Sequence, residues 1–166
     1  NGCLIEITDP GMAELKKLHS DLRSIMEATR PLSITVEGTV FTGMGEGAYY
    51  VTRDGYRKQF IEKIGFDPYP GTLNLKLTTD YDIKARSELE MHPAVILHGF
   101  KTKNRTFGDV KCYPVVINNK VKGAIVCALR SHYDPSIMEV IAPTYLRGQL
   151  KLKDGNKVKV EVFTLP

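Results

Sequence analysis

The sequence predicts a mainly β fold of the α+β class, a small six-stranded β-barrel with one or two helices. From residue 32 onward, short segments of alternating apolar and polar residues are separated by turn residues, which is typical of barrels built from short strands. Asn118 and Asn119 join two such segments at hairpin spacing, because asparagine tolerates the positive φ of tight hairpin turns. The expected strands cover residues 32–41, 72–77, 94–100, 107–117, 120–129, 137–142 and 157–163.

Two further segments of the barrel region have a different pattern. Residues 54–64 are expected to form a helix, and Gly65 ends it because glycine readily adopts the left-handed conformation of a helix C-terminus. Residues 80–91 are polar and charged with weak periodicity, so we expect a loop or a short helix there. The inward face of the first helix is expected to carry Tyr56, Phe60, Ile61 and Ile64.

An N-terminal segment precedes the barrel. Residues 3–7 alternate like a strand, and apolar residues at spacings of three and four predict an amphipathic helix over residues 10–27, capped by Thr8 or Asp9. This pair of elements resembles the last wing strand and closing helix of a winged helix-turn-helix domain. Since the chain does not begin with methionine, we expect residues 1–29 to be the end of such a domain and 30–166 to be the barrel. The alternative is a helix that only packs on the barrel, and DNA binding is expected only through the missing part.

The composition is that of a globular protein with a mild positive charge. The 166 residues carry a net charge of +4, which suits anionic ligands but is too small to indicate nucleic-acid binding. No apolar run approaches the roughly 18–20 residues of a membrane span, and no signal peptide opens the chain. Cys3, Cys112 and Cys127 lack metal-binding spacing, so we expect free thiols and a cytoplasmic protein.

The most informative motif is the run GFDPYPGTLNL at residues 65–75. Its two prolines and Gly71 predict a rigid turn, after which a strand begins. Side chains two apart on a strand share a face, so Thr72 and Asn74 point one way while the leucines between them point to the core. Two neutral oxygens at the rim of a stiff element can hold Mg²⁺ together with substrate phosphates. The alternative is that both residues only cap the turn.

A second motif places three glycines at alternate positions, Gly43, Gly45 and Gly47, after an apolar strand. Such a run lets backbone N–H groups turn inward and hold phosphate oxygens. The spacing matches neither the dinucleotide-binding fingerprint nor the Walker pattern, so a glycine-rich hairpin is the alternative. Combined with the rim formed by Thr72 and Asn74, the motif favours phosphoryl transfer.

Four blocks of sequence, taken together, resemble the archaeal CTP-dependent riboflavin kinases. The blocks are residues 43–50, 65–77, 108–113 and 139–147, and the resemblance extends from residue 36 to about residue 162. It implies a kinase that uses Mg²⁺ and transfers the γ-phosphoryl group of CTP to riboflavin, giving FMN and CDP. Residues 150–160 are in turn similar to the final strands of small cradle-loop barrels.

The resemblance also implies roles for individual residues on the donor side. Thr72 and Asn74 match the magnesium-binding positions of the family. A carboxylate at Glu46 repels phosphate, so it is expected to point outward, pair with a cation or help to hold the metal. Arg147 offers a fork of donors, with a surface ion pair as the alternative. The nucleotide is expected at Gly43, Met44, Gly45, Glu46, Gly47, Ala48, Thr144, Tyr145, Leu146 and Arg147.

On the acceptor side, the resemblance implies that Ser131 and Glu139 contact flavin. Family members commonly carry threonine where this chain has Ser131, which keeps the hydroxyl but loses the methyl group. Glu139 is assigned a binding role first, because positioning and charge stabilisation dominate phosphoryl transfer. It is also a candidate general base. His132 is a second candidate base. The alternative is that it is a histidine at the barrel rim whose hydrogen bonds are made within the protein. Asp109 and Lys111 are expected to orient loops at the same mouth.

Two remaining expectations concern partners. The basic cluster of Lys101, Lys103 and Arg105 is interpreted as a solvated hairpin tip rather than a nucleic-acid site. The alternative to an enzyme is a transcriptional regulator whose barrel senses flavin or nucleotide. The glycine run and the rim of Thr72 and Asn74 weigh against it, because a sensor has less need of a site for metal and phosphate.

Overall fold

The computed structural model describes residues 7–28, 33–128 and 134–163. The chain divides near residue 31 into two units. In the first unit, α1 (Asp9–Ala28) is the predicted amphipathic helix. The Thr8 hydroxyl oxygen accepts a hydrogen bond from the Gly11 N–H at 3.3 Å, so Thr8 is the cap. The strand expected at residues 3–7 falls almost wholly outside the described residues, and the winged-helix origin of this unit stays a prediction.

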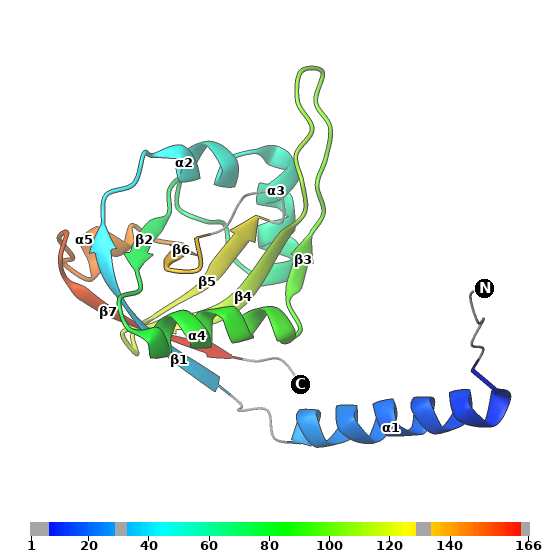
Figure 1. Cartoon of the computed structure of the whole chain (residues 1–166). Coiled ribbons are helices and arrows are strands. Elements are labelled where there is room, and N and C mark those ends of the chain that lie inside the picture. The colour runs from blue at the N-terminus through cyan, green and yellow to red at the C-terminus, as the bar shows by residue number, and fades with distance from the viewer. Residues whose placement is uncertain (1–6, 29–32, 129–133, 164–166) are drawn as a thin grey trace, which may run out of the picture. The chain divides into compact units, whose positions relative to one another are not determined.

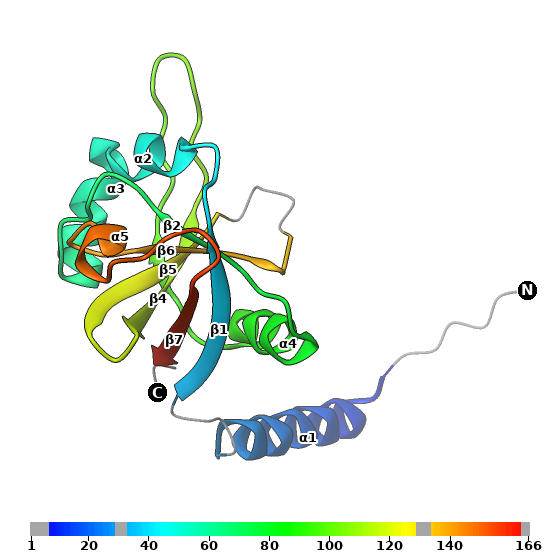
Figure 2. The same ribbon diagram turned by 90° about the vertical axis from the view of Figure 1, so that its left-hand side faces the viewer.

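The second unit is a closed antiparallel barrel of six strands (Figures 1 and 2). The strands run in the order β4-β5-β6-β2-β1-β7, and β7 pairs back onto β4 to close the ring. A seventh strand, β3 (Val95–Leu97), extends the sheet from the first residues of β4. The predicted six-stranded barrel is therefore confirmed, and β3, which falls within the strand expected at residues 94–100, lies outside the closed ring. Its strands are β1 (Ser33–Phe41), β2 (Leu73–Lys76), β4 (Val110–Ile117), β5 (Val121–Ala128), β6 (Ile137–Ile141) and β7 (Lys157–Phe163).

Alternation along the strands creates two apolar cores. On β4, Tyr113, Val115 and Ile117 point into the barrel, whereas Cys112 points outward. The hairpin between β4 and β5 turns at Asn118 and Asn119, whose positive φ values of 47° and 55° confirm the predicted tight turn. The outer core packs helices and the long hairpin against the barrel wall. Its buried members are Val51, Tyr56, Phe60, Leu97, Phe107, Cys112, Ala124, Val126 and Ile141.

Short helices cover the barrel. They are α2 (Glu46–Val51), α3 (Asp54–Gln59), the π-helix η1 (Phe60–Ile64), α4 (Asp80–Glu88), the 3₁₀ turn η2 (Leu89–Met91) and α5 (Leu146–Gln149). Gly65, at φ 88°, ends η1 as predicted. The expectation that Ile61 points inward is wrong: this side chain is 47% exposed. Tyr56, Phe60 and Ile64 lie four residues apart and occupy the inward face, which leaves their neighbour turned to solvent.

The segment between β3 and β4 projects from the barrel as a long hairpin (Figure 1). At its base the rings of Phe100 and Phe107 stack with centroids 4.6 Å apart, and Lys101 forms a bridge with Thr106 farther out. The strands expected at residues 94–100 and 107–117 are shorter than predicted, covering Val95–Leu97 and Val110–Ile117. Among the described residues, no helix combines the length and apolar character needed to cross a membrane.

Candidate active site

Two cavities lie on either side of the first turn of α2. The first, of about 650 Å³, is lined by the glycine run, the start of β2 and the turn that leads into α5. The second, of about 420 Å³, lies between α2, α3 and the long hairpin. The cavities share four lining residues, namely Glu46, Gly47, Thr72 and Glu139. A group held at this shared wall can therefore be reached from both sides.

The glycine run approaches β2 so closely that side chains are excluded. A Cβ on Gly43 would overlap the Asn74 side chain, and a Cβ on Gly47 would overlap that of Thr72. Gly45 has a φ of 81° and stands immediately before α2, where the left-handed region favours glycine. The two motifs found in the sequence thus form one surface, with the backbone of one against the polar face of the other.

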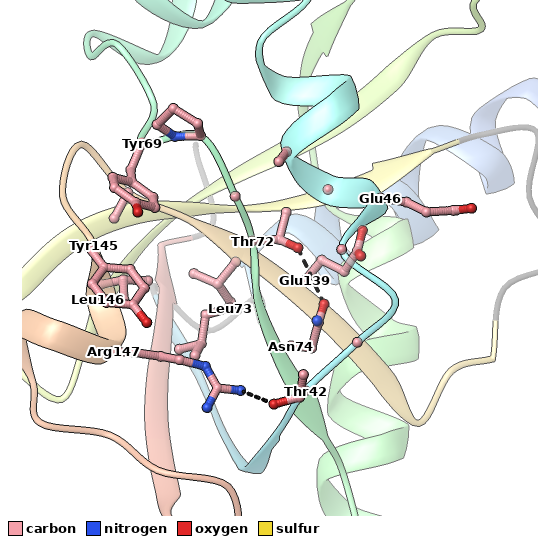
Figure 3. Close-up of a pocket in the computed structure, with 18 of the residues that line it drawn as sticks. Thr42, Glu46, Tyr69, Thr72, Leu73, Asn74, Glu139, Tyr145, Leu146 and Arg147 are labelled. Carbon is pink, nitrogen blue, oxygen red and sulfur yellow. Dashed lines mark hydrogen bonds between the residues drawn. The ribbon is translucent and has the colours of Figure 1, made fainter.

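Three polar side chains meet at the shared wall. Asn74 on β2 pairs directly with Glu139 on β6, so the two side chains project from the same face of the sheet. Thr72 contributes its hydroxyl from the residue before β2, at 3.3 Å from Asn74 Oδ1 (Figure 3). The side chain of Glu46 points away from these groups (Figure 3), which is the first of the three arrangements that the sequence left open for it.

The Asn74 carboxamide can be oriented in two ways that differ in their chemistry, because rotation of the amide exchanges its oxygen and nitrogen. In one, its oxygen faces the Thr72 hydroxyl and the Glu139 carboxylate. In the other, its nitrogen donates to Glu139 Oε1 at 3.3 Å and its oxygen accepts from the Gly43 N–H at 3.2 Å. The second orientation satisfies the hydrogen bonds within the protein, whereas the first gathers oxygens as a cation requires.

The oxygens of Thr72 and Asn74 fit a small divalent ion. Neighbouring ligands of an octahedral Mg²⁺ lie about 2.9 Å apart, and these two atoms lie 3.3 Å apart in the first orientation. Both ligands are neutral, and Glu139 beside them is half-buried. Burial raises the pKa of Glu139, and the charge of Glu46 raises it further. The repulsion between the carboxylates of Glu46 and Glu139 would be reduced by a cation bound at this wall.

The segment 144–147 lines the first cavity, but its arginine already makes hydrogen bonds within the protein. Arg147 donates to Asp154 Oδ1 at 2.7 Å and to the Phe41 carbonyl oxygen at 2.9 Å. Thr42 also donates to the Asp154 carboxylate, so these contacts tie α5 to the end of β1, where the glycine run begins. The ion pair that was the alternative for Arg147 is thus present in the structure.

Two tyrosines form an open aromatic surface at one end of the first cavity. The rings of Tyr69 and Tyr145 have centroids 5.1 Å apart and are tilted by 32° (Figure 3). They are 40% and 51% exposed, so each has a face available to a ligand. A planar ring placed there would lie at the end of the cavity away from Asn74 (Figure 3).

The second cavity is aromatic at the end away from the shared wall. Phe107 forms edge-on contacts with Tyr50 and Tyr56 at centroid distances of 6.3 and 6.0 Å. Arg105 and Asp109 from the hairpin supply polar groups to the same cavity. Asp109 Oδ1 accepts a hydrogen bond from the Gly99 N–H at 2.7 Å, which fixes the base of the hairpin.

Comparison with known proteins identifies the chain's relatives. A family model named CTP-dep_RFKase, described as a domain of unknown function, DUF120, matches residues 40–162. The chain is 46% identical to the riboflavin kinase of Archaeoglobus fulgidus over 98% of its own length and 68% of the relative's. It is 48% identical to the riboflavin kinase of Methanocella arvoryzae over 96% of its length and 70% of that protein's. The chain belongs to the CTP-dependent riboflavin kinase family.

Most of the family positions named from the sequence meet around the two cavities. The residues at 43–48 and 144–147, together with Thr72, Asn74 and Glu139, all line the first cavity. Ser131 and His132 fall outside the described residues. Lys111 is not among the residues that line either cavity, whereas Asp109 lines the second.

Sequence reasoning missed the aromatic side chains and the arginine of the second cavity. Arg105 lies exposed at the hairpin tip, as interpreted from the sequence, but its side chain also lines the cavity beside Phe107, which the sequence did not indicate. The run of basic residues concealed this, since lysines two and four positions earlier share its charge. The only local signal was the Arg-Thr-Phe sequence at 105–107, where an aromatic residue follows the basic run.

Proposed function

We propose that this protein is a CTP-dependent riboflavin kinase that transfers the γ-phosphoryl group of CTP to riboflavin, giving FMN and CDP. The observation that carries the proposal is the pair of cavities that meet at Thr72 and Glu139. A phosphoryl transferase must hold donor and acceptor in line across one reacting group, and proximity of this kind supplies much of the rate enhancement. Family membership supports the choice of substrates.

In this proposal the first cavity binds CTP. The backbone N–H groups of the glycine run hold the phosphates, and the absence of side chains at Gly43 and Gly47 lets this backbone lie close to Asn74 and Thr72. Tyr69 and Tyr145 lie at the far end, where the cytosine ring would stack. Arg147 positions the loop through Phe41 and Asp154 rather than binding phosphate.

Thr72 and Asn74 would hold Mg²⁺ at the shared wall. When bound, the ion neutralises the charge that develops on the phosphate oxygens during transfer. Because its protein ligands are neutral, the nucleotide phosphates supply most of the negative charge around it. We therefore expect weak Mg²⁺ binding to the free protein and tight binding in the presence of CDP.

The second cavity would take riboflavin with its terminal ribityl hydroxyl at the shared wall. The hydroxyl oxygen forms a bond to the γ-phosphorus as the bond from that phosphorus to the β–γ bridging oxygen breaks, and CDP leaves. Glu139 accepts a hydrogen bond from the attacking hydroxyl, and its raised pKa suits it to receive the proton. Ser131 is proposed as a second flavin contact on the resemblance alone.

The direct test incubates the purified protein with riboflavin, Mg²⁺ and each nucleoside triphosphate in turn, and separates the flavins by chromatography. We expect FMN with CTP, little with the other donors, and none when the divalent ion is chelated. An Asn74→Ala variant should require a higher Mg²⁺ concentration while the barrel stays folded. If no donor yields FMN, the kinase proposal is rejected; FMN formed with ATP but not CTP would reject the donor.

A further inference from the structure

The second cavity has two different ends, and this difference determines how an acceptor must lie in it. This argument rests on the proposed function. One end of the second cavity is the wall that it shares with the donor cavity, at Thr72 and Glu139. The reacting hydroxyl of the acceptor has to lie at this wall. The remainder of the acceptor must then extend toward the end formed by Tyr56, Phe107 and Arg105. A flavin therefore places its ring system among aromatic side chains.

Arg105 is the one cationic side chain among the described residues that line this cavity. Its Nη2 donates to the Tyr50 hydroxyl at 2.8 Å. Its guanidinium carbon lies 5.5 Å from the Tyr50 ring centroid and 5.4 Å from that of Phe107. Among the described residues it forms no ion pair with a carboxylate, so several of its five N–H donors are available to a ligand.

The position of Arg105 is fixed by the hairpin that carries it. The Arg105 N–H donates to the Thr102 hydroxyl at 3.1 Å, and its carbonyl oxygen accepts from the Thr102 N–H at 2.8 Å. Two residues later, Phe107 stacks on Phe100, and their backbones are joined by a hydrogen bond of 2.8 Å. These contacts hold the backbone at Arg105, and the Tyr50 hydroxyl holds its guanidinium, which lowers the cost of ordering this exposed side chain when a ligand binds.

We infer that Arg105 selects the acceptor by donating hydrogen bonds to the carbonyl oxygens at the polar edge of the flavin ring. A planar fork of N–H donors matches a planar heteroaromatic edge that carries carbonyl oxygens and a ring nitrogen. Phe107 and Tyr50 provide the aromatic surroundings for the rest of the ring. Arg105 is therefore a specificity residue for the acceptor and has no part in donor binding.

The test compares Arg105→Ala and Arg105→Lys with Lys103→Ala, a matched control on the same hairpin that removes a cation outside both cavities. We expect Arg105→Ala to raise KM for riboflavin about tenfold or more, with KM for CTP unchanged, because hydrogen bonds to a charged donor are lost. Arg105→Lys should be intermediate, since lysine keeps the charge but loses the fork. Lys103→Ala should behave like the parent protein.

A second readout separates recognition from a merely structural role. Riboflavin and 2-thioriboflavin differ at one ring carbonyl, so the parent protein should discriminate between them while Arg105→Ala should not. Loss of affinity that is equal for both flavins, or a riboflavin KM in Arg105→Ala equal to that of Lys103→Ala, would overturn the inference.

The inference remains testable if the kinase proposal fails. If the parent protein forms no FMN with any triphosphate, riboflavin binding is measured directly by quenching of flavin fluorescence. Tighter binding to the parent protein than to Arg105→Ala, with discrimination against the thio analogue, supports the role of Arg105 without catalysis. Absence of riboflavin binding to the parent protein overturns both proposals.

Discussion

The two cavities that meet at Thr72 and Glu139 are formed by different kinds of structural element. The donor cavity is formed largely by backbone and small residues at strand ends, and glycines pack directly against Thr72 and Asn74. The acceptor cavity is formed by large side chains on short helices and a projecting hairpin. A Cβ added to the glycine run would meet the Asn74 or Thr72 side chain, which has to keep its position in the proposed metal site, whereas the large side chains of the acceptor cavity can change rotamer. We therefore expect abrupt losses from changes on the donor side and graded losses on the acceptor side.

The largest effect is expected from adding one methyl group to the glycine run. In Gly47→Ala the new Cβ would overlap the Thr72 side chain and displace the proposed metal and phosphate site. A displacement of about 1 Å at a reacting centre can cost about 100-fold, so we expect a loss of that order in kcat/KM for riboflavin phosphorylation. Steady-state kinetics measure the loss, and circular dichroism checks that the barrel is intact.

Gly45→Ala is the matched control for this change. Its Cβ would meet no atom within 4 Å, but the φ of 81° strains any residue other than glycine. The expected cost is about 1 kcal/mol of folding stability, with a much smaller loss of activity than in Gly47→Ala. Equal losses of kcat/KM in both variants would show that loop conformation, and not close packing on Thr72, limits the reaction.

The parts of the fold that depend on local pattern could be predicted from the sequence, and those that depend on distant contacts could not. Alternation of apolar and polar residues located the strands. Gly65 marked the end of a helix, and Asn118 and Asn119 marked a hairpin turn. The pairing of β4 with β7 that closes the barrel joins residues far apart in the chain, so no local pattern reveals it. The helix α2 was missed because its glycines indicate a loop.

The candidate site shows the same division. Thr72 and Asn74 could be named because strand periodicity places them on one face, and the structure sets the glycine run against that face. Arg105 could not, because its place beside Phe107 and Tyr50 depends on where the projecting hairpin lies relative to α2. In the sequence Arg105 has the same charge as Lys101 and Lys103, and only its position in the folded hairpin distinguishes it from them.

A smaller effect is expected at the end of the donor cavity, where side chains rather than backbone form the surface. Stacking of a base on an aromatic ring contributes about 1–3 kcal/mol, so Tyr145→Ala should weaken CDP binding about tenfold. Tyr145→Phe should restore it, because the ring remains. Calorimetric titration with CDP and with inorganic pyrophosphate separates base from phosphate binding. An equal loss for both ligands would contradict base stacking on Tyr145.

The smallest effect is expected at Asp154, which holds Arg147 and the end of β1 from the solvent side. Hydrogen bonds from Arg147 and Thr42 hold the pKa of Asp154 below its usual value. A carboxyl group whose pKa is lower in the folded state stabilises the fold above its unfolded pKa, near 3.9, and this contribution disappears as pH falls through the folded value. Asp154→Asn should therefore lower the melting temperature slightly at neutral pH, and the difference from the parent protein should vanish in acid. Melting curves recorded by circular dichroism between neutral and acidic pH measure it. A difference that stays constant over this range would show that Asp154 supports the donor cavity through shape and not through its charge.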